Sequence, residues 1–322
     1  MTVPTMHAIR ITEFGGPERL TRTELPRPVP GPGEVLVRVR AAGYNPADMH
    51  VREGFRKVPE ALRPVWPLPV VLGSDLSGTV AEVGPGVTEW QVGDEVYGLV
   101  NFPGRGAAYA EYATAPAAHL ARKPATLDHV TAAGVPMAGL TAHQFLFHHL
   151  AEHVRGTVLV NGAAGGVGHF AVQLARAAGA ERVVAVASGR HREYLEGLGV
   201  DLFVDREAGP ASAAVRDADF VLDTVGGPDA HLLLDTLRPG GALSSVYLAD
   251  QRPERAAGLG VTLAPFLQVR SSGADLAELG ARIDAGEVVP AVDAVFPLRE
   301  AAAAHEHAAR GHLRGKIVLT VD

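Results

Sequence analysis

The stretch VLVNGAAGGVGHFAVQLARAAGA, residues 158–180, restricts the fold of this chain more than any other segment. It begins with a compact apolar run, continues through a turn dense in glycine, and ends in apolar residues at helical spacing. A strand that leads through a tight turn into a helix is the first half of a βαβ unit. The stretch therefore predicts an α/β fold with a doubly wound parallel sheet.

The glycines of this turn are spaced for a ligand. Gly162, Gly165 and Gly168 form the pattern GxxGxxG directly before the predicted helix, with Gly166 and Val167 inside the turn. Because glycine has no side chain, the backbone can approach a pyrophosphate, and the free N–H groups at the helix N-terminus favour negative charge. A tight turn without a ligand is the alternative, but the strand–turn–helix setting favours a dinucleotide site.

The composition and the predicted secondary structure of the chain change near residue 125. Residues 1–124 are rich in proline and glycine and contain short β-like runs, which predicts a mostly β domain. Residues 125–272 begin with a helical pattern that Pro136 interrupts, and then alternate apolar strands with helices. We expect a six-stranded sheet there, its last strands at 241–246 and 261–269. Residues 273–322 are expected to return to the first domain.

Composition narrows the classes of function. The 322 residues carry a formal net charge of −7, which argues against nucleic-acid and anionic membrane partners. We find no signal-peptide pattern and no membrane-spanning apolar run, so we expect a cytoplasmic protein with a small-molecule substrate. The chain contains no cysteine, which excludes disulfides, thiolate nucleophiles and zinc sites with sulfur ligands.

The strand after the glycine turn bears on which dinucleotide binds. An acidic side chain at its end would bind the ribose 2′-hydroxyl of NAD, about twenty residues after the turn. This chain has Ser188 there, followed by Arg190 and Arg192, and Arg206 comes after the next strand. Arginine can donate charge-assisted hydrogen bonds to a 2′-phosphate, so we expect NADPH. Arginines that merely solvate the start of a helix are the alternative.

Six motifs are spread over nearly the whole chain: AAGYNPADMHVREG, LGSDLSGTVAEVGPGVTEWQVGDEVYG, AAYAEYA, NGAAGGVG, LDTVGG and GHLRGKIVL. Together they resemble the medium-chain dehydrogenase/reductase superfamily, and within it the zinc-free quinone oxidoreductase and enone reductase branch. The resemblance implies a GroES-like catalytic domain, a Rossmann domain and an active site between them. It also implies a homodimer joined through the Rossmann sheets.

The resemblance shows where this chain departs from the zinc-dependent relatives. Those proteins hold their catalytic metal through a cysteine in the first loop, a histidine in a Gly-His-Glu motif and a late cysteine. Here the loop carries Tyr44 and Asn45, and the second motif reads Gly73-Ser74-Asp75, so we expect no metal site. The closely spaced histidines lack a third ligand and are expected on amphipathic surface helices: His149, His153, His305 and His307.

By resemblance, the loop from Asn45 to Asp48 lies at the floor of the active site. Asn45 would hydrogen-bond the nicotinamide or the substrate carbonyl, and Asp48 would order the loop. Relatives carry a tyrosine, a suspected proton donor, five residues after this asparagine, where this chain has His50. His50 and Tyr44 are therefore the candidate donors. A bystander histidine, a packing aromatic and a proton from solvent are the alternatives.

Further contacts are expected at the ends of helices and strands. Thr141 matches the family's threonine that faces the nicotinamide, although it can instead be an ordinary helix hydroxyl bonded to the preceding turn. Four residues follow predicted strands at the edge where parallel sheets bind ligands, unless they are simple strand-to-loop transitions: Thr224, Val225, Ser244 and Ser245. An apolar pocket, with Arg105 for an anionic group, is expected from Tyr44, Phe55, Trp66, Phe102, Tyr247 and Phe266.

These features predict an NADPH-dependent, zinc-independent oxidoreductase that reduces quinones or the activated C=C bond of enones by hydride transfer. Without a Lewis acid, ionising an alcohol is unfavourable, whereas hydride delivery to a conjugated acceptor needs only hydrogen-bond donors at the carbonyl oxygen. A pathway-specific enoyl reductase of bacterial biosynthesis is one alternative. A non-catalytic NADPH-binding sensor is the other, because binding needs only the glycine turn and the phosphate pocket.

Overall fold

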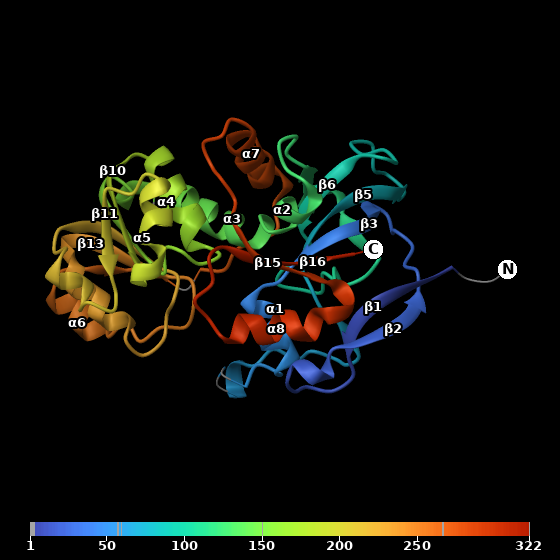
Figure 1. Cartoon of the computed structure of the whole chain (residues 1–322), viewed down its shortest axis with the longest axis horizontal. Coiled ribbons are helices and arrows are strands. Elements are labelled where there is room, and N and C mark those ends of the chain that lie inside the picture. The colour runs from blue at the N-terminus through green and yellow to red at the C-terminus, as the bar shows by residue number, and fades with distance from the viewer. Residues whose placement is uncertain (1–3, 57, 59, 150, 266, 322) are drawn as a thin grey trace.

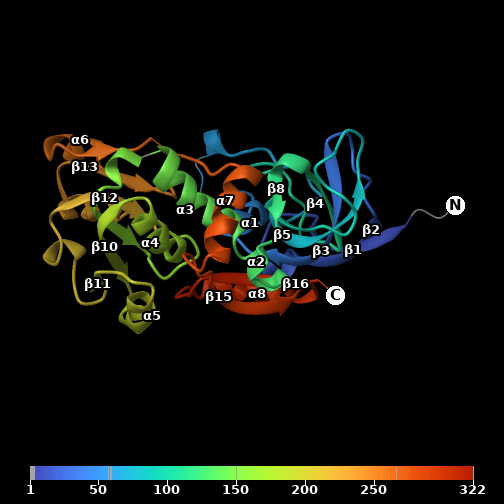
Figure 2. The ribbon, with the colours of Figure 1, turned by 90° about the horizontal axis from the view of Figure 1, so that it is seen from above.

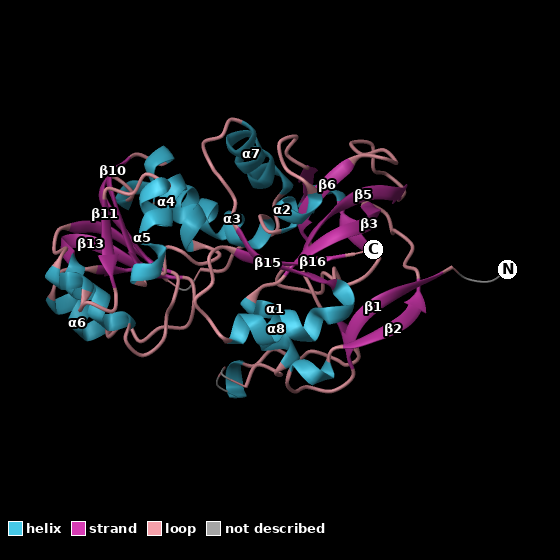
Figure 3. Cartoon of the chain, viewed as in Figure 1, coloured by secondary structure: helices cyan, strands magenta, loops and turns pink. Residues whose placement is uncertain are grey.

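The computed structural model describes residues 4–321 except 57, 59, 150 and 266. Figure 1 shows two units placed along the long axis of the molecule, a parallel sheet covered by helices at one end and a mostly β unit at the other. Figure 3 shows that helices flank the sheet of the first unit, whereas strands and loops dominate the second. The predicted combination of a doubly wound α/β unit with a mostly β unit is therefore confirmed.

The parallel sheet has the strand order β11-β10-β9-β12-β13-β14. The chain runs outward from β9 to β11 and then returns to β12 on the other side of β9, so the order reverses beside β9. Open α/β sheets bind ligands at such a reversal, beyond the carboxyl ends of the strands. The strands are β9 (Gly156–Asn161), β10 (Ala180–Ala187), β11 (Leu202–Asp205), β12 (Ala218–Asp223), β13 (Leu237–Ser245) and β14 (Thr262–Leu263).

The helices of this unit are α3 (Pro136–His143), α4 (Gly168–Ala177), α5 (Arg192–Gly197) and α6 (Pro253–Gly258). Strand β9 is buried throughout its centre, and Phe170 and Leu174 of α4 pack into the same core. The strand predicted over 261–269 is wrong in extent, because β14 spans only two residues. Pro265 lacks the N–H group that a further ladder bond would need.

The mostly β unit contains a seven-stranded sheet and a three-stranded sheet, β2-β1-β4. The larger sheet has the order β15-β16-β3-β5-β6-β8, with β7 also paired to β3. The last two strands of the chain, β15 and β16, thus join the larger sheet of the mostly β unit. The exact boundaries of the domains stay predictions. The strands are β1 (Thr5–Ile11), β2 (Thr21–Pro26), β3 (Glu34–Gly43), β4 (Val70–Val71), β5 (Asp75–Val83), β6 (Glu95–Leu99), β7 (Tyr112–Pro116), β8 (Leu120–Arg122), β15 (Val292–Pro297) and β16 (Lys316–Thr320).

Four more helices are α1 (Pro46–Arg52), α2 (His129–Ala133), α7 (Gly273–Asp284) and α8 (Ala301–Ala309). The predicted interruption at Pro136 is confirmed, since α2 ends before it and α3 begins with it. A π-helical turn, Gln144–His149, follows α3 directly. Figure 2 shows α3 and α7 between the two sheets, where they contact each other. Within the described ranges, no helix has the length and apolar content that crossing a bilayer requires.

Candidate active site

The glycine turn after β9 has the geometry that its sequence predicts. Gly162 has a φ of +76°, and a Cβ on Gly168 would lie 2.2 Å from the carbonyl oxygen of Gly162. Both positions therefore require glycine for the turn itself. A Cβ on Gly165 would meet only the carbonyl oxygen of Gly162, at 3.3 Å. Gly165 is therefore less crowded by the protein than Gly162 and Gly168, at the turn that leads into α4.

His169, which the sequence analysis did not single out, holds this turn in place. Its ring is fully buried, its Nδ1–H donates to the carbonyl of Gly165 at 2.9 Å, and its Nε2 accepts the N–H of Ala291 at 3.2 Å. Burial lowers the pKa of His169 to about 4. The neutral imidazole therefore ties the glycine turn to the segment before β15.

Lys316 connects the glycine turn to the loop of Asn45. Its backbone N–H donates to Ala291, and a Cβ on Gly166 would lie 3.1 Å from its Cδ. Its buried ammonium donates to the side-chain oxygen of Asn45 and, at 2.8 Å, to the carbonyl of Tyr44. One side chain thus joins the candidate cofactor turn to the candidate catalytic loop.

Asp75, the first residue of β5, completes a buried network with Lys316 and Asn45. Its carboxylate accepts from the Asn45 side chain at 2.9 Å and from the N–H of Met137 at 2.9 Å, and it lies 3.6 Å from the Lys316 ammonium. Burial raises the pKa of Asp75 and lowers that of Lys316, and their mutual attraction opposes both shifts. The Asn45 side chain is therefore held at its amide nitrogen by the Asp75 carboxylate and at its oxygen by the Lys316 ammonium.

The carboxylate of Asp48 bonds the backbone on both sides of the loop. Its carboxylate accepts the N–H groups of Asn45 at 2.8 Å and Gly73 at 3.0 Å, and the Tyr109 hydroxyl lies 3.4 Å away. Burial raises the pKa of Asp48 to about 7. These bonds fix the entry to α1 against the segment before β5, so the geometry makes Asp48 a positioning residue.

The side chain of Tyr44 is packed inside the protein rather than exposed to solvent. Its side chain is buried, its ring meets that of His305 edge-on with centroids 4.7 Å apart, and burial raises the pKa of its hydroxyl. Tyr247, two residues after β13, adds to that rise, which places it near Tyr44. A raised pKa makes the hydroxyl a weaker acid, which favours the packing alternative. His50 is half-buried on α1.

The expectation that His305 lies on a surface is wrong. His305 is only 2 % exposed, and its Nδ1 accepts a hydrogen bond from Arg52 at 2.8 Å. The apolar side of α8 faces the core, and the ring fills the space beside Tyr44 and Tyr109. His307 is partly exposed and pairs with Asp293 at 2.8 Å. His153 is also partly exposed, and the side chain of His149 lies outside the described part of the structure.

Basic side chains gather beside Ser188, which is buried at the end of β10. The charges of Arg190, Arg314 and His312 all lower the pKa of nearby His191, after the effect of its burial. Arg206 lies 3.5 Å from His312, which adds another cation to this group. The guanidinium of Arg192 instead stacks over Phe203 and contacts Glu196. The carboxylate of Asp205 lies next to the same segment after β10, since a Cβ on Gly189 would lie 2.5 Å from its oxygen.

The residues expected to contact a ligand at helix and strand ends differ from one another in burial and in hydrogen bonding. Thr141 is buried and donates to the carbonyl of Met137 at 2.7 Å, as the helix-hydroxyl alternative requires. Thr224 donates to Asn161 at 2.7 Å and borders the glycine turn, and Val225 next to it is half exposed. Ser245 donates to Asp223 at 3.1 Å. Ser244 is fully buried inside the sheet, and its hydroxyl has no partner among the described groups.

The predicted pocket residues come from several loops. Phe55 packs on Trp66 with ring centroids 6.2 Å apart, and Phe102 packs against the core of the parallel sheet. Arg105 is exposed and donates to the carbonyl of Pro67 at 3.2 Å. Phe266 lies outside the described residues. Among the described residues of the predicted aromatic set, Tyr247 also lies near Tyr44, since it contributes to the rise in the pKa of Tyr44.

Sequence reasoning missed Lys316, Asp75, His169 and Arg314. A signal existed for Lys316, because the chain has only three lysines, and this one stands between glycine and an apolar strand. Arg314 belongs to the motif GHLRGKIVL, which contributed to the resemblance without any residue being given a role. Asp75 stood in the Gly73-Ser74-Asp75 motif without being given a role, because its partners Asn45, Met137 and Lys316 are distant in sequence. His169 follows the glycine turn directly, but its bond to Ala291 spans 122 positions.

Comparisons with known proteins agree with this geometry. Residues 31–125 match the family model described as the alcohol dehydrogenase GroES-like domain, and residues 198–319 match the model described as zinc-binding dehydrogenase. The chain is 33% identical over 295 residues to the chloroplastic NADPH-dependent alkenal/one oxidoreductase of Arabidopsis thaliana, an alignment that covers 89% of this chain and 72% of that protein.

Two solved structures share the fold over nearly their whole length. The quinone oxidoreductase of Coxiella burnetii is 34% identical with a TM-score of 0.89, and the match covers 99% of this chain and 100% of that one. A mycobacterial protein solved in complex with NADPH is 32% identical with a TM-score of 0.84, over 98% and 100% of the two chains. The chain therefore belongs to the quinone oxidoreductase branch of the medium-chain dehydrogenase/reductase superfamily, a family of NAD(P)H-dependent oxidoreductases.

Proposed function

We propose that this protein is an NADPH-dependent reductase of quinones or of the activated C=C bond of enones. The observation that carries the proposal is the bridge made by Lys316, which joins the glycine turn to the Asn45 loop. A protein that only bound a dinucleotide would need the turn and the phosphate pocket, but not this link to the loop of the other unit. The bridge therefore favours catalysis over the sensor alternative.

Support for NADPH comes from the charges beside Ser188. Arg190, Arg206, Arg314 and His312 surround the end of β10, where a ribose 2′-phosphate would lie if the pyrophosphate bound the glycine turn. Planar guanidinium groups suit phosphate oxygens. The solved relative that contains NADPH is consistent with this choice.

The buried network around Asn45 can orient a substrate without reacting with it. NADPH supplies a hydride from its nicotinamide ring when bound. Asn45 keeps its amide donor oriented, because Asp75 and Lys316 hold both ends of its side chain. The amide can then stabilise charge on a substrate carbonyl oxygen as it develops. Because the pKa of Tyr44 is raised, we propose His50 or solvent as the source of the proton.

A catalytic zinc does not fit the donor set around Asn45. The carboxylates of Asp48 and Asp75 already accept hydrogen bonds from buried N–H groups, and the Lys316 ammonium lies 3.6 Å from Asp75. An ammonium offers no lone pair and repels a cation, and the sequence has no cysteine. We therefore propose that the reduction is independent of zinc.

The test is oxidation of NADPH and NADH, followed by absorbance, against quinones and short and long enones with EDTA present. We expect turnover with NADPH despite the chelator, and the preferred acceptor distinguishes quinone from C=C reduction. Binding of NADPH without turnover of any acceptor would overturn the proposed activity and favour the sensor. Size-exclusion chromatography of the same sample tests the homodimer that the resemblance implies.

A further inference from the structure

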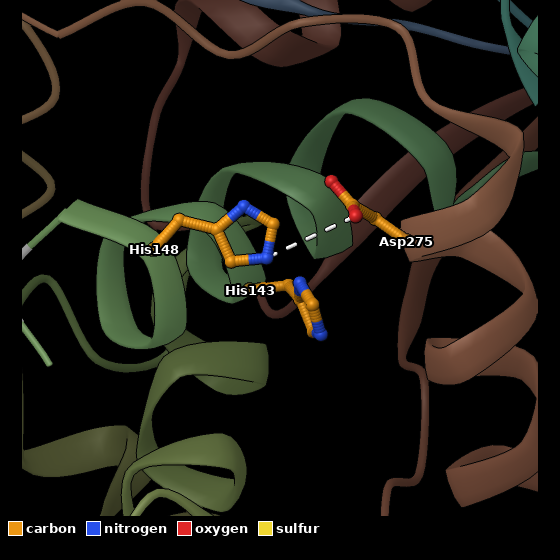
Figure 4. Close-up of side chains that lie close together, drawn as sticks. All are labelled: His143, His148 and Asp275. Carbon is orange, nitrogen blue, oxygen red and sulfur yellow. Dashed lines mark ion pairs between the residues drawn. The ribbon is translucent and has the colours of Figure 1, made fainter.

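Three side chains of types that bind metals lie together where the end of α3 approaches the start of α7 (Figure 4). His143 ends α3, His148 lies on the π-helical turn that follows, and Asp275 lies in the first turn of α7. One ligand atom from each residue lies within 4.8 Å of the other two. Figure 4 shows the three side chains turned toward one another.

The π-helical turn puts the two histidines on one face. In a continuous α-helix, residues five apart point roughly 140° away from each other. A π turn is wider and brings residues five apart into register, and such turns are frequent at functional sites. His143 and His148 are five apart, and their ring centroids are 5.4 Å apart. The local departure from α-helical geometry therefore creates the pair.

His143 is oriented as a metal-binding histidine would be. Its Nε2 lies 3.4 Å from the carboxylate of Glu278, and its Nδ1 is buried without a hydrogen-bond partner in the described structure. Metal-ligating histidines commonly turn one ring N–H toward a carboxylate and offer the other nitrogen to the metal. His143 is only 1 % exposed, so its unpaired Nδ1 is enclosed by the protein beside His148 and Asp275.

Asp275 and His148 supply the other two ligand atoms. One carboxylate oxygen of Asp275 accepts from the Gln144 side chain at 2.8 Å, while the other lies 3.8 Å from the Nε2 of His148. Gln144 also bonds the backbone N–H and carbonyl of Arg270, which fixes the π turn to the segment before α7. The side chain of His148 is 46 % exposed, so it can rotate, and solvent can reach the cluster.

The surroundings do not oppose a cation. Arg282 is the nearby basic side chain that acts on His143, and it is engaged with Glu287 at 3.0 Å and stacked over Phe147. Glu278 and Asp275 contribute negative charge on the same side. Two imidazoles, one carboxylate and a position open to water form a ligand set that Zn²⁺ accepts.

We propose that His143, His148 and Asp275 bind a divalent cation of the Zn²⁺ type, with water completing its coordination. The ion would link α3 of the parallel-sheet unit to α7, which the Tyr97 hydroxyl anchors to the other unit through the carbonyl of Leu276 at 2.6 Å. The sequence predicted no metal site, because the histidines and the aspartate are 127 or more residues apart. The site stabilises the joint between the units and takes no part in hydride transfer.

Calorimetric titration of the EDTA-treated, dialysed full-length protein with Zn²⁺ tests the proposal. We expect the wild type to bind one more equivalent than His148→Gln, and Asp275→Asn to weaken that equivalent at least tenfold. His231→Asn is the matched control, since it removes a partly exposed imidazole whose Nδ1 bonds the nearby carbonyl of Pro228 at 2.9 Å. Circular dichroism verifies that each variant is folded.

Two further readouts separate this site from adventitious binding. Co²⁺ should give the visible absorption of a four-coordinate site in the wild type and in His231→Asn, but not in His148→Gln. Added Zn²⁺ should raise the unfolding temperature of the wild type and leave that of His148→Gln unchanged. Equal Zn²⁺ stoichiometry and affinity in the wild type and His148→Gln, or an equal loss in His231→Asn, would overturn the proposal.

Discussion

At the scale of the residue, Lys316 shows how much of the candidate site rests on one buried charge. Its ammonium meets Asp75, Asn45 and the carbonyl of Tyr44, with only 5 % of the residue exposed. Removing one partner of a buried ion pair leaves the other charge without compensation. Its neighbours, rather than its position in the sequence, give this lysine its role.

We predict that Lys316→Met destabilises the protein by about 3–5 kcal/mol, because Asp75 stays buried without its cation. The double variant Lys316→Met/Asp75→Asn should recover part of that loss, since it removes the unpaired carboxylate. Urea denaturation of the wild type and both variants measures these differences. A single variant that loses less than about 1 kcal/mol would show that the pair contributes little.

The buried imidazole of His169 leads to a prediction about how the free energy of unfolding changes in acid. Its pKa falls from an ordinary 6.5 to about 4 on folding. Between these values the unfolded chain takes up a proton that the folded protein does not, so stability is full above pH 6.5 and falls as the pH drops toward 4. At 1.36 kcal/mol per pH unit, His169 alone accounts for a loss of about 3 kcal/mol.

His169→Gln should therefore show a shallower decline in the free energy of unfolding between pH 6.5 and 4 than the wild type. The comparison cancels the contribution of other groups, among them buried His305, whose pKa is lowered to about 3. Denaturant unfolding at a series of pH values gives the two slopes, and His231→Asn should keep the wild-type slope. Parallel curves for the wild type and His169→Gln would contradict the assignment.

Ser188 tests the proposed preference for NADPH. Ser188→Asp adds negative charge beside the expected 2′-phosphate, so it should lower the NADPH-over-NADH ratio of kcat/KM roughly tenfold, or about 1.4 kcal/mol. Ser188→Ala, which removes the hydroxyl without adding charge, should stay close to the wild type. Steady-state kinetics with both cofactors provides the ratios. An unchanged ratio in Ser188→Asp would place the phosphate elsewhere.

At the scale of the element, the cap at the start of a helix contributes to the stability of the protein, as the buried apolar face of the helix does. Helix α7 begins at Gly273, and the Ser272 side chain accepts the N–H of Asp275 at 3.1 Å. The same helix packs against α3 and β8, and so belongs to the contact between the two units. The cap at its start therefore affects more than the helix itself.

We predict that Ser272→Ala destabilises the protein by about 1 kcal/mol through loss of the cap, whereas Ser272→Asp, which can still accept that bond, stays near the wild type. Because Asp275 loses its fixed position, Ser272→Ala should also weaken Zn²⁺ binding at the proposed site. Urea unfolding and the calorimetric titration measure the two effects. Equal losses of stability in the alanine and aspartate variants would rule out the cap as the cause.

At the scale of the whole molecule, both units contribute to the candidate site. The glycine turn belongs to the parallel sheet, Asn45 and Asp75 belong to the mostly β unit, and Lys316 lies on β16 but reaches both. A ligand that contacts the turn and the Asn45 loop would therefore bind only the assembled molecule. Its binding energy should stabilise the fold as a whole.

We predict that NADPH at about one hundred times its dissociation constant raises the free energy of unfolding by about 2.7 kcal/mol. NADH at the same concentration should stabilise less, because it lacks the 2′-phosphate. Thermal or urea unfolding with each cofactor tests binding without requiring the right acceptor for turnover. The absence of any shift with NADPH would contradict the proposed cofactor.

The sequence alone was sufficient for the fold class and for the strand–turn–helix geometry at the glycine turn. Strand, turn and helix follow one another within residues 156–177, and the positive φ of Gly162 and the close approach of Gly168 to the carbonyl of Gly162 arise within the turn itself. The interruption at Pro136 is likewise a local backbone effect. Such features are encoded by neighbouring residues, so they can be predicted without knowledge of the distant chain.

Only the tertiary structure decided which side chains share a site. Lys316 meets Asn45 across 271 positions, and Asp275 meets His148 because a π turn and a helix cap bring them together. His305 is buried rather than exposed because Tyr44 and Tyr109 pack against it. Contacts of this kind depend on how separate elements pack, and that information is distributed over the whole chain.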